Sequence, residues 1–367
     1  MFRKHQPNIG GLMLTNHQPN IGVLADDLTS AADGAAPFVA RGLSARIGRG
    51  QLPRQTAAVI AVDSGSRSAT LSQACEDITR LTSLLSGCAV LYKTVDSTLR
   101  GHITQELEAC FAASGRRSVV FAPAFPQAGR TTVGGIQLVD GVPVSESVYG
   151  QDPVHPARCS ALVDLLPNCI KDVTLLDAIM QEELDTQIAA IEDPESILWL
   201  GSPGMAAALA RRFVPAKTAA QLLDCISTDV LVVIGSANPR SHRQADLVRG
   251  LSGVTLLRGP AMRERDPAAV LRRIADAAAH ELQDPRFGAL IATGGDTMEA
   301  VLDLLNVREF EIVQELEPGF PLSRAKLGDG RTLLLAMKAG GFGSDDALER
   351  AVARIRGAAQ AFSRDLL

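Results

Sequence analysis

Aromatic side chains are scarce in this sequence of 367 residues, at 4%, with one tryptophan and two tyrosines. The sequence also has no run of eighteen apolar residues, so no membrane-spanning helix is expected. Hydrophobic residues nevertheless make up 46% of the chain, and its core must be built mainly from Ala, Val, Leu and Ile. Such a core, in a chain with 32 glycines, fits helices packed on a parallel sheet.

Positive charge is not in excess either, since the net charge is −5 and the isoelectric point is about 5.7. General nucleic-acid binding is therefore not expected, although local basic patches could meet an anionic ligand. There is no Cys-x-x-Cys pair and no layout typical of a signal peptide, so we expect reduced thiols and a cytoplasmic protein. The six cysteines are Cys75, Cys88, Cys110, Cys159, Cys169 and Cys225.

Several well-known catalytic signatures are missing. The sequence has no Gly-x-x-x-x-Gly-Lys-Ser/Thr loop, no His-Glu-x-x-His pair and no Gly-x-Ser-x-Gly elbow. Its six histidines are scattered, which argues against a structural zinc or a histidine-based triad. The absence of Gly-x-Gly-x-x-Gly after a strand counts against a nicotinamide-dependent dehydrogenase.

Two glycine-rich turns are the most informative features that are present. The first, residues 293–297 (TGGDT), follows an apolar run typical of a buried strand and precedes a helical pattern at 298–305. The second, residues 338–343 (KAGGFG), lies between a strand-like run at 332–337 and a helix expected from Asp345. Such helix entrances present free N–H groups and a favourable dipole to phosphate. The pair therefore predicts a nucleotide site.

Strand and helix signals alternate along the chain, which predicts an α/β fold with two domains and mainly parallel sheets. We expect a tail at 1–18, a first domain at 19–220 and a second at 221–367, with a loop at 258–268. The tail is set apart because its HQPNIG repeats at 17–22, where the first strand begins. Expected strands cover 21–25, 57–62, 89–92, 118–122, 196–200, 229–234, 287–292 and 332–337, and expected helices cover 30–40, 71–85, 103–113 and 182–191.

Polar residues gather where the expected strands of the first half end. Asp26 and Asp27 follow the first strand, and we expect one to cap the next helix while the other meets a substrate hydroxyl or a metal, unless both are caps. Arg67 is either a carboxylate ligand or a solvated surface residue. Ser236, in the second half, could hold a phosphate or ribose; the competing interpretation is that Ser236 or Asn238 simply caps the next helix.

The densest polar group lies at residues 93–101, where two cations, one carboxylate and three hydroxyls follow a strand. A core strand does not carry so many polar groups unless they meet a partner, so a small polyhydroxylated anion is favoured over a merely polar loop. A further loop, residues 122–135, is rich in proline and glycine and carries Arg130; it is either a binding loop or a crossover with structural glycines.

Taken in order, these motifs resemble the four-carbon acid sugar kinase family, long catalogued as a domain of unknown function. The resemblance extends from Ile21 almost to the end of the chain. It rests on residues 25–29, 66–67, 93–101, 123–126, 129–132 and 152–156 in the first half, and on 235–236, 293–297, 317–319 and 338–343 in the second. It implies a sugar-acid-binding domain followed by an ATP-binding domain, and phosphorylation of the terminal hydroxyl of threonate, erythronate or 3-oxo-tetronate.

The resemblance also implies roles for single residues. It places the sugar acid at Asp26, Asp27, Arg67, Lys93, Asp96, Ser97, Arg100 and Arg130, and ATP at Ser236, Gly294, Gly295, Asp296, Thr297, Gly340 and Gly341. Mg²⁺ would bridge the phosphates, and Asp27 or Asp96 would accept the proton of the reacting hydroxyl. Lys338 would neutralise developing charge, or else be a surface residue at the end of a strand.

One departure from the family is visible, because the segment from Ser236 to Gly294 is shorter than usual, as if a strand–helix piece were missing. A sugar-acid sensor with a degenerate ATP site is the alternative function that this departure suggests. The stereochemistry of the acid is not set by the sequence, and a homo-oligomer is one option for the assembly.

Overall fold

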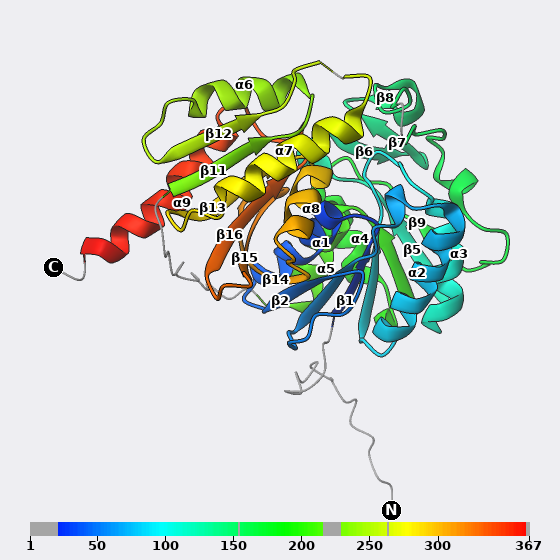
Figure 1. The fold of residues 1–367 in the computed structure, drawn as a ribbon. Coiled ribbons are helices and arrows are strands. Elements are labelled where there is room, and N and C mark those ends of the chain that lie inside the picture. The colour runs from blue at the N-terminus through cyan, green and yellow to red at the C-terminus, as the bar shows by residue number, and fades with distance from the viewer. Residues whose placement is uncertain (1–20, 153–154, 216–228, 263, 365–367) are drawn as a thin grey trace, which may run out of the picture.

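The computed structural model describes residues 21–152, 155–215, 229–262 and 264–364 (Figure 1). Over these residues its frame is a sheet of thirteen strands in the order β12-β11-β13-β16-β15-β14-β2-β3-β1-β4-β10-β5-β9. Helices cover both faces of this sheet (Figure 1). The predicted α/β fold with a mainly parallel sheet is thus confirmed, and the sheets of the two halves join into one.

The first half forms one end of the sheet, where every pair of neighbouring strands is parallel. Short apolar strands such as β1 are buried on both faces, as expected for parallel strands covered by helices. The strands are β1 Ile21–Ala25, β2 Ala45–Arg49, β3 Val59–Asp63, β4 Val90–Thr94, β5 Ser118–Ala122, β9 Val173–Leu175 and β10 Ile197–Gly201. The helices are α1 Leu28–Val39, α2 Leu71–Leu85, α3 Ile103–Ser114, α4 Gln181–Ala190 and α5 Pro203–Phe213.

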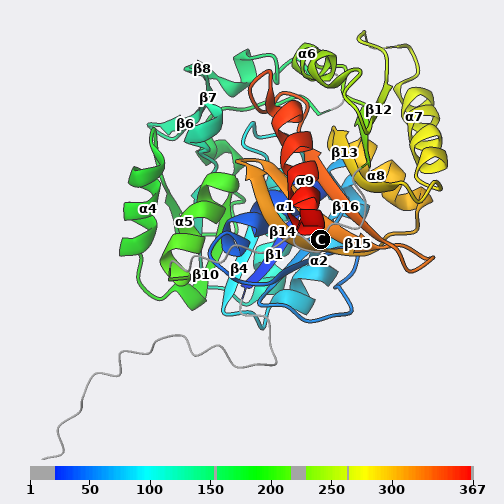
Figure 2. The ribbon, with the colours of Figure 1, turned by 90° about the vertical axis from the view of Figure 1, so that its left-hand side faces the viewer.

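The second half places four parallel strands, β12-β11-β13-β16, beside an antiparallel pair, β15 and β14. Its helix α6 packs against α9, and α9 runs in front of the sheet in Figure 2. The strands are β11 Asp229–Ile234, β12 Val254–Arg258, β13 Phe287–Thr293, β14 Glu309–Glu317, β15 Phe320–Lys326 and β16 Thr332–Lys338. The helices are α6 Pro239–Val248, α7 Pro267–Glu281, α8 Gly295–Leu304 and α9 Ala347–Arg364.

The halves meet where β14 pairs antiparallel with β2, with Phe310 opposite Ile47. On one face of the sheet a single apolar core includes Phe38 of α1 from the first half and Met298 of α8 from the second. The opposite face carries two separate cores, one for each half. Ladder and shared core together make the described halves one packed body.

A small antiparallel sheet stands apart from the main sheet, built from β6 Arg130–Val133, β7 Ile136–Val139 and β8 Val142–Pro143. It forms the loop region that was expected at residues 122–135 to be either a binding loop or a crossover. Figure 1 shows it at the same end of the molecule as the loop that follows β12. It therefore adds structure above the carboxyl ends of the strands.

Several elements were not predicted. The short strands β2 and β9 and the half-exposed strand β12 lack the long apolar run of a buried strand, and charged side chains alternate with apolar ones at the start of β14. Helix α7 begins inside the expected loop 258–268, because Pro267 suits a first helical position and the Asp266 side chain accepts the Ala269 N–H at 2.9 Å.

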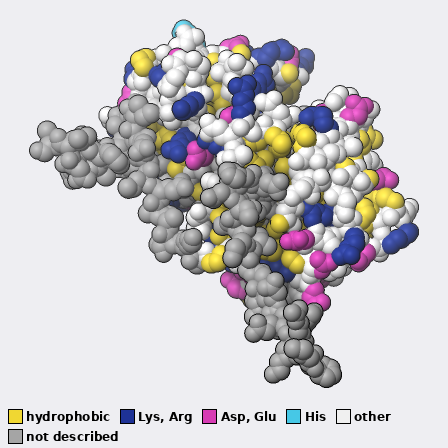
Figure 3. Space-filling view, turned by 90° about the horizontal axis from the view of Figure 1, so that it is seen from below, with side chains coloured by type: hydrophobic (Ala, Val, Ile, Leu, Met, Phe, Trp, Pro, Cys, Tyr) yellow, Lys and Arg dark blue, Asp and Glu magenta, His cyan; other side chains and the backbone are white. Residues whose placement is uncertain are grey.

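Some expectations concern residues outside the described part of the chain. They include the tail at 1–18, Cys225 and the domain boundary expected at 220. The other five cysteines are free thiols. No helix among the described residues is long and apolar enough to cross a membrane. In the view from below, acidic and basic side chains are interspersed over the part that is not grey (Figure 3).

Candidate functional site

Asp26 and Arg67 form the centre of the acid-lined side of the site. Asp26 directly follows β1, Arg67 lies beyond the end of β3, and these parallel strands are neighbours, so their carboxyl ends meet at one edge. The guanidinium donates to both oxygens of Asp26, Nε at 2.8 Å and Nη2 at 3.0 Å. Both side chains are nearly buried, since that of Arg67 is 12% exposed and that of Asp26 is 5% exposed. Arg67 is therefore not a solvated surface residue.

Asp27 is the helix cap of the acidic pair. Its Oδ1 accepts the Ser30 N–H at 2.6 Å at the start of α1, and its Oδ2 also pairs with Arg67. Burial opposes ionisation of both carboxyls, but the charges of Arg67 and Lys93 lower the pKa of Asp26 below its ordinary value. Burial and the neighbouring Asp26 charge raise the pKa of Asp27. The pKa values of the two neighbouring carboxyl groups are therefore shifted in opposite directions.

Asp96 lies beyond the end of β4, on the other side of β1. Its Oδ2 accepts hydrogen bonds from the Thr98 hydroxyl, at 2.5 Å, and from Arg100 Nε. Although burial opposes ionisation, the charges of Arg100 and Arg67 lower the pKa of Asp96 well below its ordinary value. Asp96 is therefore held as a carboxylate.

Lys93 lies beneath this surface, at 1% exposure. Its Nζ pairs with Glu106 Oε2 at 2.8 Å and donates to the Thr94 carbonyl at 2.9 Å. Glu106 in turn accepts the Ser66 hydroxyl at 2.7 Å. The expected substrate ligand Lys93 thus has buried protein partners, and its charge acts on Asp26 from below. Ser97 is also buried, and its carbonyl accepts the Gln137 side-chain amide at 2.8 Å.

Arg130 connects the acid side to the second half. Its Nη2 donates to the Tyr149 hydroxyl at 2.8 Å, and its guanidinium lies 5.6 Å from the ring centres of both Tyr149 and Phe342. Phe342 belongs to the second glycine turn and also meets Phe125 edge to face, 6.2 Å between ring centres. Arg100 lies over the Tyr149 ring at 5.5 Å. Aromatic and cationic groups therefore join the halves here.

The glycine turns come together at the ends of β11, β13 and β16, which are neighbours in the sheet. A methyl group added at Gly235 would collide with Thr297 Oγ1, and one added at Gly340 would collide with Ser236 Oγ. Gly294 has a φ of 96°, which favours glycine, and an added methyl group there would meet both Thr297 and Ser236. Ser236 and the two turns thus share one small volume.

The groups around this volume are of a kind that binds phosphate in proteins. The first N–H groups of α8 have no partner within the helix, and α8 starts here at Gly295. Thr293 Oγ1 is fully buried and has no hydrogen-bond partner in the described part of the chain. Asn238, not Ser236, caps α6 by accepting the Arg240 N–H at 2.9 Å. Ser236 is therefore not needed as the cap.

Lys338 ends β16 and is buried, at 1% exposure, so it is not a surface residue. Its Nζ donates to the carbonyls of Ala339 at 3.0 Å and Phe342 at 2.9 Å, inside the turn that it begins. Burial and the nearby Arg240 charge lower the pKa of Lys338 to about 7. Its contacts hold the turn, and no phosphate-facing position is needed to explain them.

The small volume around Ser236 adjoins the side of the site that carries Asp26 and Asp27. A methyl group added at Gly295 would lie 2.7 Å from Thr29 Oγ1, so the start of α8 abuts the first turn of α1. Thr29 stands two residues after Asp27. Asp296 follows Gly295, and its charge acts on His155 of the acid side. One continuous site therefore spans both halves of the sheet.

Two residues near the acid side were given no role from the sequence. Asp152 lies 3.9 Å from Arg100 Nη1 and accepts the His155 N–H at 3.0 Å. Burial and the charges of Arg67 and Arg100 lower the pKa of His155. Both residues belong to the 152–156 motif that carried part of the resemblance, and that motif was the available signal.

The described residues do not form a ready-made metal site of their own. No group of three or more His, Cys, Asp or Glu among the described residues could hold a metal ion. Mg²⁺ commonly binds through substrate phosphates, water and one or two carboxylates, so this arrangement fits an ion that arrives with a nucleotide. Asp296 is the carboxylate of the first glycine turn.

Comparison with known proteins agrees with this geometry. The model of the sugar-binding N-terminal domain family matches residues 21–255, and that of a nucleotide-binding C-terminal domain matches 257–348. The D-threonate kinase of Bordetella bronchiseptica is 29% identical, covering 91% of this chain and 97% of its own. The 3-oxo-tetronate kinase of Pectobacterium atrosepticum is 25% identical, covering 90% and 97%.

Two solved structures share the fold. A Salmonella typhimurium LT2 protein described as a putative tRNA synthase has a TM-score of 0.75 at 21% identity, covering 90% of this chain and 98% of its own. A Haemophilus influenzae protein of the DUF1537 family has a TM-score of 0.70 at 22% identity, covering 91% and 100%. The resemblance seen in the motifs is confirmed, and the chain belongs to the family of proteins with this sugar-binding N-terminal domain, here followed by a nucleotide-binding C-terminal domain.

Proposed function

We propose that this protein is an ATP-dependent kinase that phosphorylates the terminal hydroxyl of a four-carbon sugar acid. Relatives at 25–29% identity over most of the chain are named D-threonate kinase and 3-oxo-tetronate kinase. The nucleotide-binding domain match supports ATP as the phosphate donor. Threonate, erythronate and 3-oxo-tetronate are the candidate acceptors.

The contact between Gly295 and Thr29 carries this proposal. This contact brings the start of α8, where we expect phosphate to bind, against the start of α1, the helix that Asp27 caps. Phosphoryl transfer depends mainly on positioning and charge stabilisation, so a donor site and an acceptor site must adjoin. The remaining proposed nucleotide contacts are Ser236, Gly294, Asp296, Thr297, Gly340 and Gly341.

On the acid side, Arg100 and Arg130 are the cations placed to meet the substrate carboxylate. Arg100 is 26% exposed and gives one N–H to Asp96, while Arg67 is already bound to both members of the aspartate pair. Asp26, Asp27 and Ser97 then face the hydroxyl groups of the acid. Arg100 is the more accessible of the two cations, because Arg130 is 8% exposed and already bonds the Tyr149 hydroxyl.

For the chemical step, Asp27 is favoured over Asp96 as the base. The substrate oxygen attacks the γ-phosphorus, the bond to the ADP oxygen breaks, and the hydroxyl proton passes to the carboxylate. A base works best when its pKa lies near the working pH, and of these two carboxyls Asp27 has its pKa raised while Asp96 has its pKa lowered. Bound Mg²⁺ would supply charge neutralisation at the phosphates.

A screen of four-carbon sugar acids with ATP and Mg²⁺, reading ADP release, tests the function. We expect turnover with at least one of the threonate, erythronate or 3-oxo-tetronate isomers and none with nicotinamide cofactors. Calorimetry separates the alternative of a sensor: binding of an acid without any binding of ATP would contradict the kinase.

A further inference from the structure

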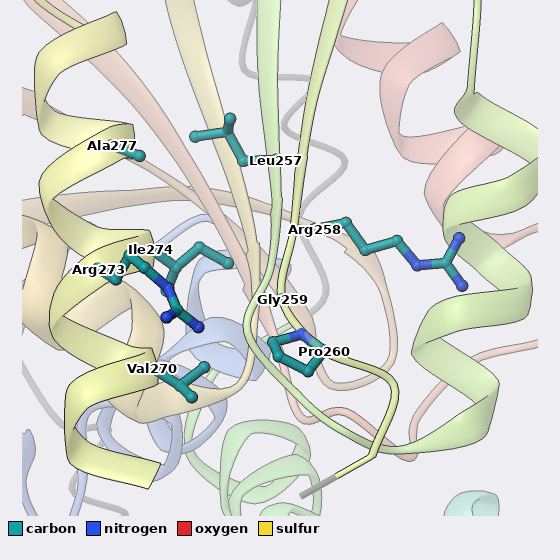
Figure 4. A pocket seen from close by; sticks show the side chains of 8 residues that line it. All are labelled: Leu257, Arg258, Gly259, Pro260, Val270, Arg273, Ile274 and Ala277. Atoms are coloured by element: carbon teal, nitrogen blue, oxygen red, sulfur yellow. The ribbon is translucent and has the colours of Figure 1, made fainter. Parts of the chain in front are cut away.

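Four side chains link the two halves of the molecule above the sheet: Arg100, Arg130 and Tyr149 from the first half and Phe342 from the second. We call them the arginine–aromatic bridge. The cavity of about 420 Å³ between the end of β12 and α7 gives no such link, because the residues that line it all belong to the second half (Figure 4). The chemical step proposed above gives Tyr149 and Phe342 no role.

Tyr149 is the centre of this bridge. Its ring centre lies 5.5 Å from the guanidinium carbon of Arg100 and 5.6 Å from that of Arg130, within the range of cation–π attraction. Its hydroxyl also accepts an N–H of Arg130 Nη2 at 2.8 Å. The ring packs against the apolar core of the first half, which limits its movement. Tyr149 therefore positions both of the cations that are proposed to meet the substrate carboxylate.

Phe342 connects the bridge to the second glycine turn. Its ring lies 5.6 Å from the Arg130 guanidinium and meets the Phe125 ring edge to face. In the backbone it directly follows Gly341, where an added methyl group would lie 3.9 Å from the Tyr149 hydroxyl. Closely packed side chains transmit a displacement, because they leave no free space to absorb it. A shift of this turn therefore moves Arg130 and Tyr149 as well.

Arg100 is the far end of the bridge. Its Nε donates to Asp96 Oδ2, and 26% of its side chain is exposed, so a ligand can still reach it. The Asp96 carboxylate and the Tyr149 ring together fix the position of its guanidinium. Three contacts in series thus connect Phe342 to Arg100, and the glycine turn proposed for phosphate to the cation proposed for the carboxylate.

Building on the proposed function, we propose that Tyr149 is a positioning residue that couples the binding of ATP to the binding of the sugar acid. Phosphate bound at the second glycine turn fixes Phe342, and the bridge then holds Arg100 where the carboxylate of the acid meets it. The first ligand to bind bears the entropy cost of ordering the bridge, so the second ligand binds more tightly. Such coupling is reciprocal, and each substrate strengthens the binding of the other by the same factor.

Calorimetry measures this coupling as the ratio of the dissociation constants of the acid without and with nucleotide. The probes are D-threonate, replaced by erythronate or 3-oxo-tetronate if the screen selects one of these, and a non-hydrolysable β,γ-imido analogue of ATP with Mg²⁺. We expect a ratio of at least about fivefold in the unmodified protein, the lower end of common coupling strengths. In Tyr149→Leu the ratio should fall below about twofold, while the analogue alone binds within about twofold of normal.

Three further variants separate positioning from packing. Tyr149→Phe loses only the hydroxyl bond to Arg130, so it should keep part of the coupling. Phe342→Leu cuts the other end of the bridge and should lower the ratio as Tyr149→Leu does, and the double variant should lose no more, because the contacts act in series. Phe111→Leu is the matched control, since Phe111 is also half-buried against the same core but lies outside the bridge. It should couple the substrates like the unmodified protein.

Unchanged coupling in Tyr149→Leu overturns the bridge, and so does an equal loss in Phe111→Leu. If Tyr149→Leu does not fold, full coupling in both Tyr149→Phe and Phe342→Leu overturns it instead. Binding of both substrates to the unmodified protein without any coupling also overturns the bridge and leaves the kinase proposal standing. An unmodified protein that binds neither the analogue nor any of the three acids overturns the proposed function as well.

Discussion

Asp27 and Asp96 stand at the ends of neighbouring elements, yet their partners make them different acids. Arg100 gives Asp96 a close ion pair, whereas Asp27 shares Arg67 with Asp26 and sits beside that second negative charge. Sequence alone left the choice of base open between them. The difference in their surroundings favours Asp27 as the base.

We expect Asp27→Asn to lower kcat by about 10²–10⁴-fold, the range for loss of a general base. Asp96→Asn should mainly raise the KM for the sugar acid, because Arg100 loses the carboxylate that holds its guanidinium in position. Steady-state kinetics at saturating ATP measures both. Full turnover by the Asp27 variant would exclude it as the base.

Lys338→Met should raise the KM for ATP about tenfold with little change in the KM for the sugar acid. The change leaves the carbonyls of Ala339 and Phe342 without their donor, and each lost buried hydrogen bond costs about 1–3 kcal/mol. Lys326→Met is the control, because Lys326 is exposed at the end of β15. An unchanged KM for ATP in the Lys338 variant would show that the turn keeps its shape without the amine.

Asp63 predicts a pH dependence of stability. Burial and the Glu299 charge raise its pKa from 3.8 to about 8. The folded protein therefore holds one more proton than the unfolded chain between these values, so the free energy of unfolding falls as pH rises from about 4 to about 8, by at most about 1.4 kcal/mol per unit.

Asp63→Asn keeps an acceptor for the Gly65 N–H, which bonds Asp63 Oδ1 at 2.8 Å, but cannot ionise. Urea unfolding at pH 5, 6.5 and 8 should show the variant gaining stability relative to the unmodified protein as pH rises. If the free energies of unfolding of the two proteins changed equally with pH, the Asp63 carboxyl would not titrate in this pH range.

At the scale of elements, the glycine turns work because helix starts and strand ends crowd around Ser236. The turn after β13 and the turn after β16 are far apart in the chain but border the same serine. Neither turn carries a familiar phosphate-loop signature. The two turns share this volume because the parallel strands that precede them, β13 and β16, end side by side.

Gly340→Ala should weaken ATP binding at least tenfold, because the added methyl group collides with Ser236 Oγ and lies 2.7 Å from its Cβ. Gly357→Ala in α9 is the control, since a methyl group there meets no atom within 4 Å. Calorimetry with ATP compares the two. Normal affinity in the Gly340 variant would remove this turn from the nucleotide site.

At the scale of the whole molecule, Arg49 ties the first half to α8. The side chain is 5% exposed and bonds the Val307 carbonyl at 3.0 Å and Asp303 Oδ1 at 3.0 Å. Helix α8 carries the first glycine turn at its other end. The ion pair therefore helps to fix the donor side against the acceptor side.

Arg49→Met should lower the free energy of unfolding by about 2–4 kcal/mol, because the carbonyls of Val307 and Glu299 lose their buried donor and Asp303 loses an ion pair. Arg308→Met is the matched control: Arg308 also pairs with Asp303, at 3.3 Å, but is 55% exposed, so the loss should be below about 1 kcal/mol. Urea unfolding measures both variants. Equal losses would show that the Arg49 contacts add nothing to the junction.

Much of the fold was predictable because long buried strands and amphipathic helices have strong local patterns. β5, β11 and α2 lie where the sequence placed them. The strands β2, β14 and β15, which join the halves, were missed because short or half-exposed strands carry weak patterns. The same holds for the half-exposed strand β12.

By itself, the sequence determined the fold class, the order of the motifs and the membership of the family, because these depend on local patterns and residue spacing. Only the tertiary structure decided that Arg67 pairs with both Asp26 and Asp27, that the two glycine turns border Ser236, and that β2 and β14 join the halves. Those features depend on contacts between residues far apart in the chain, and no local pattern specifies which distant partner a side chain meets.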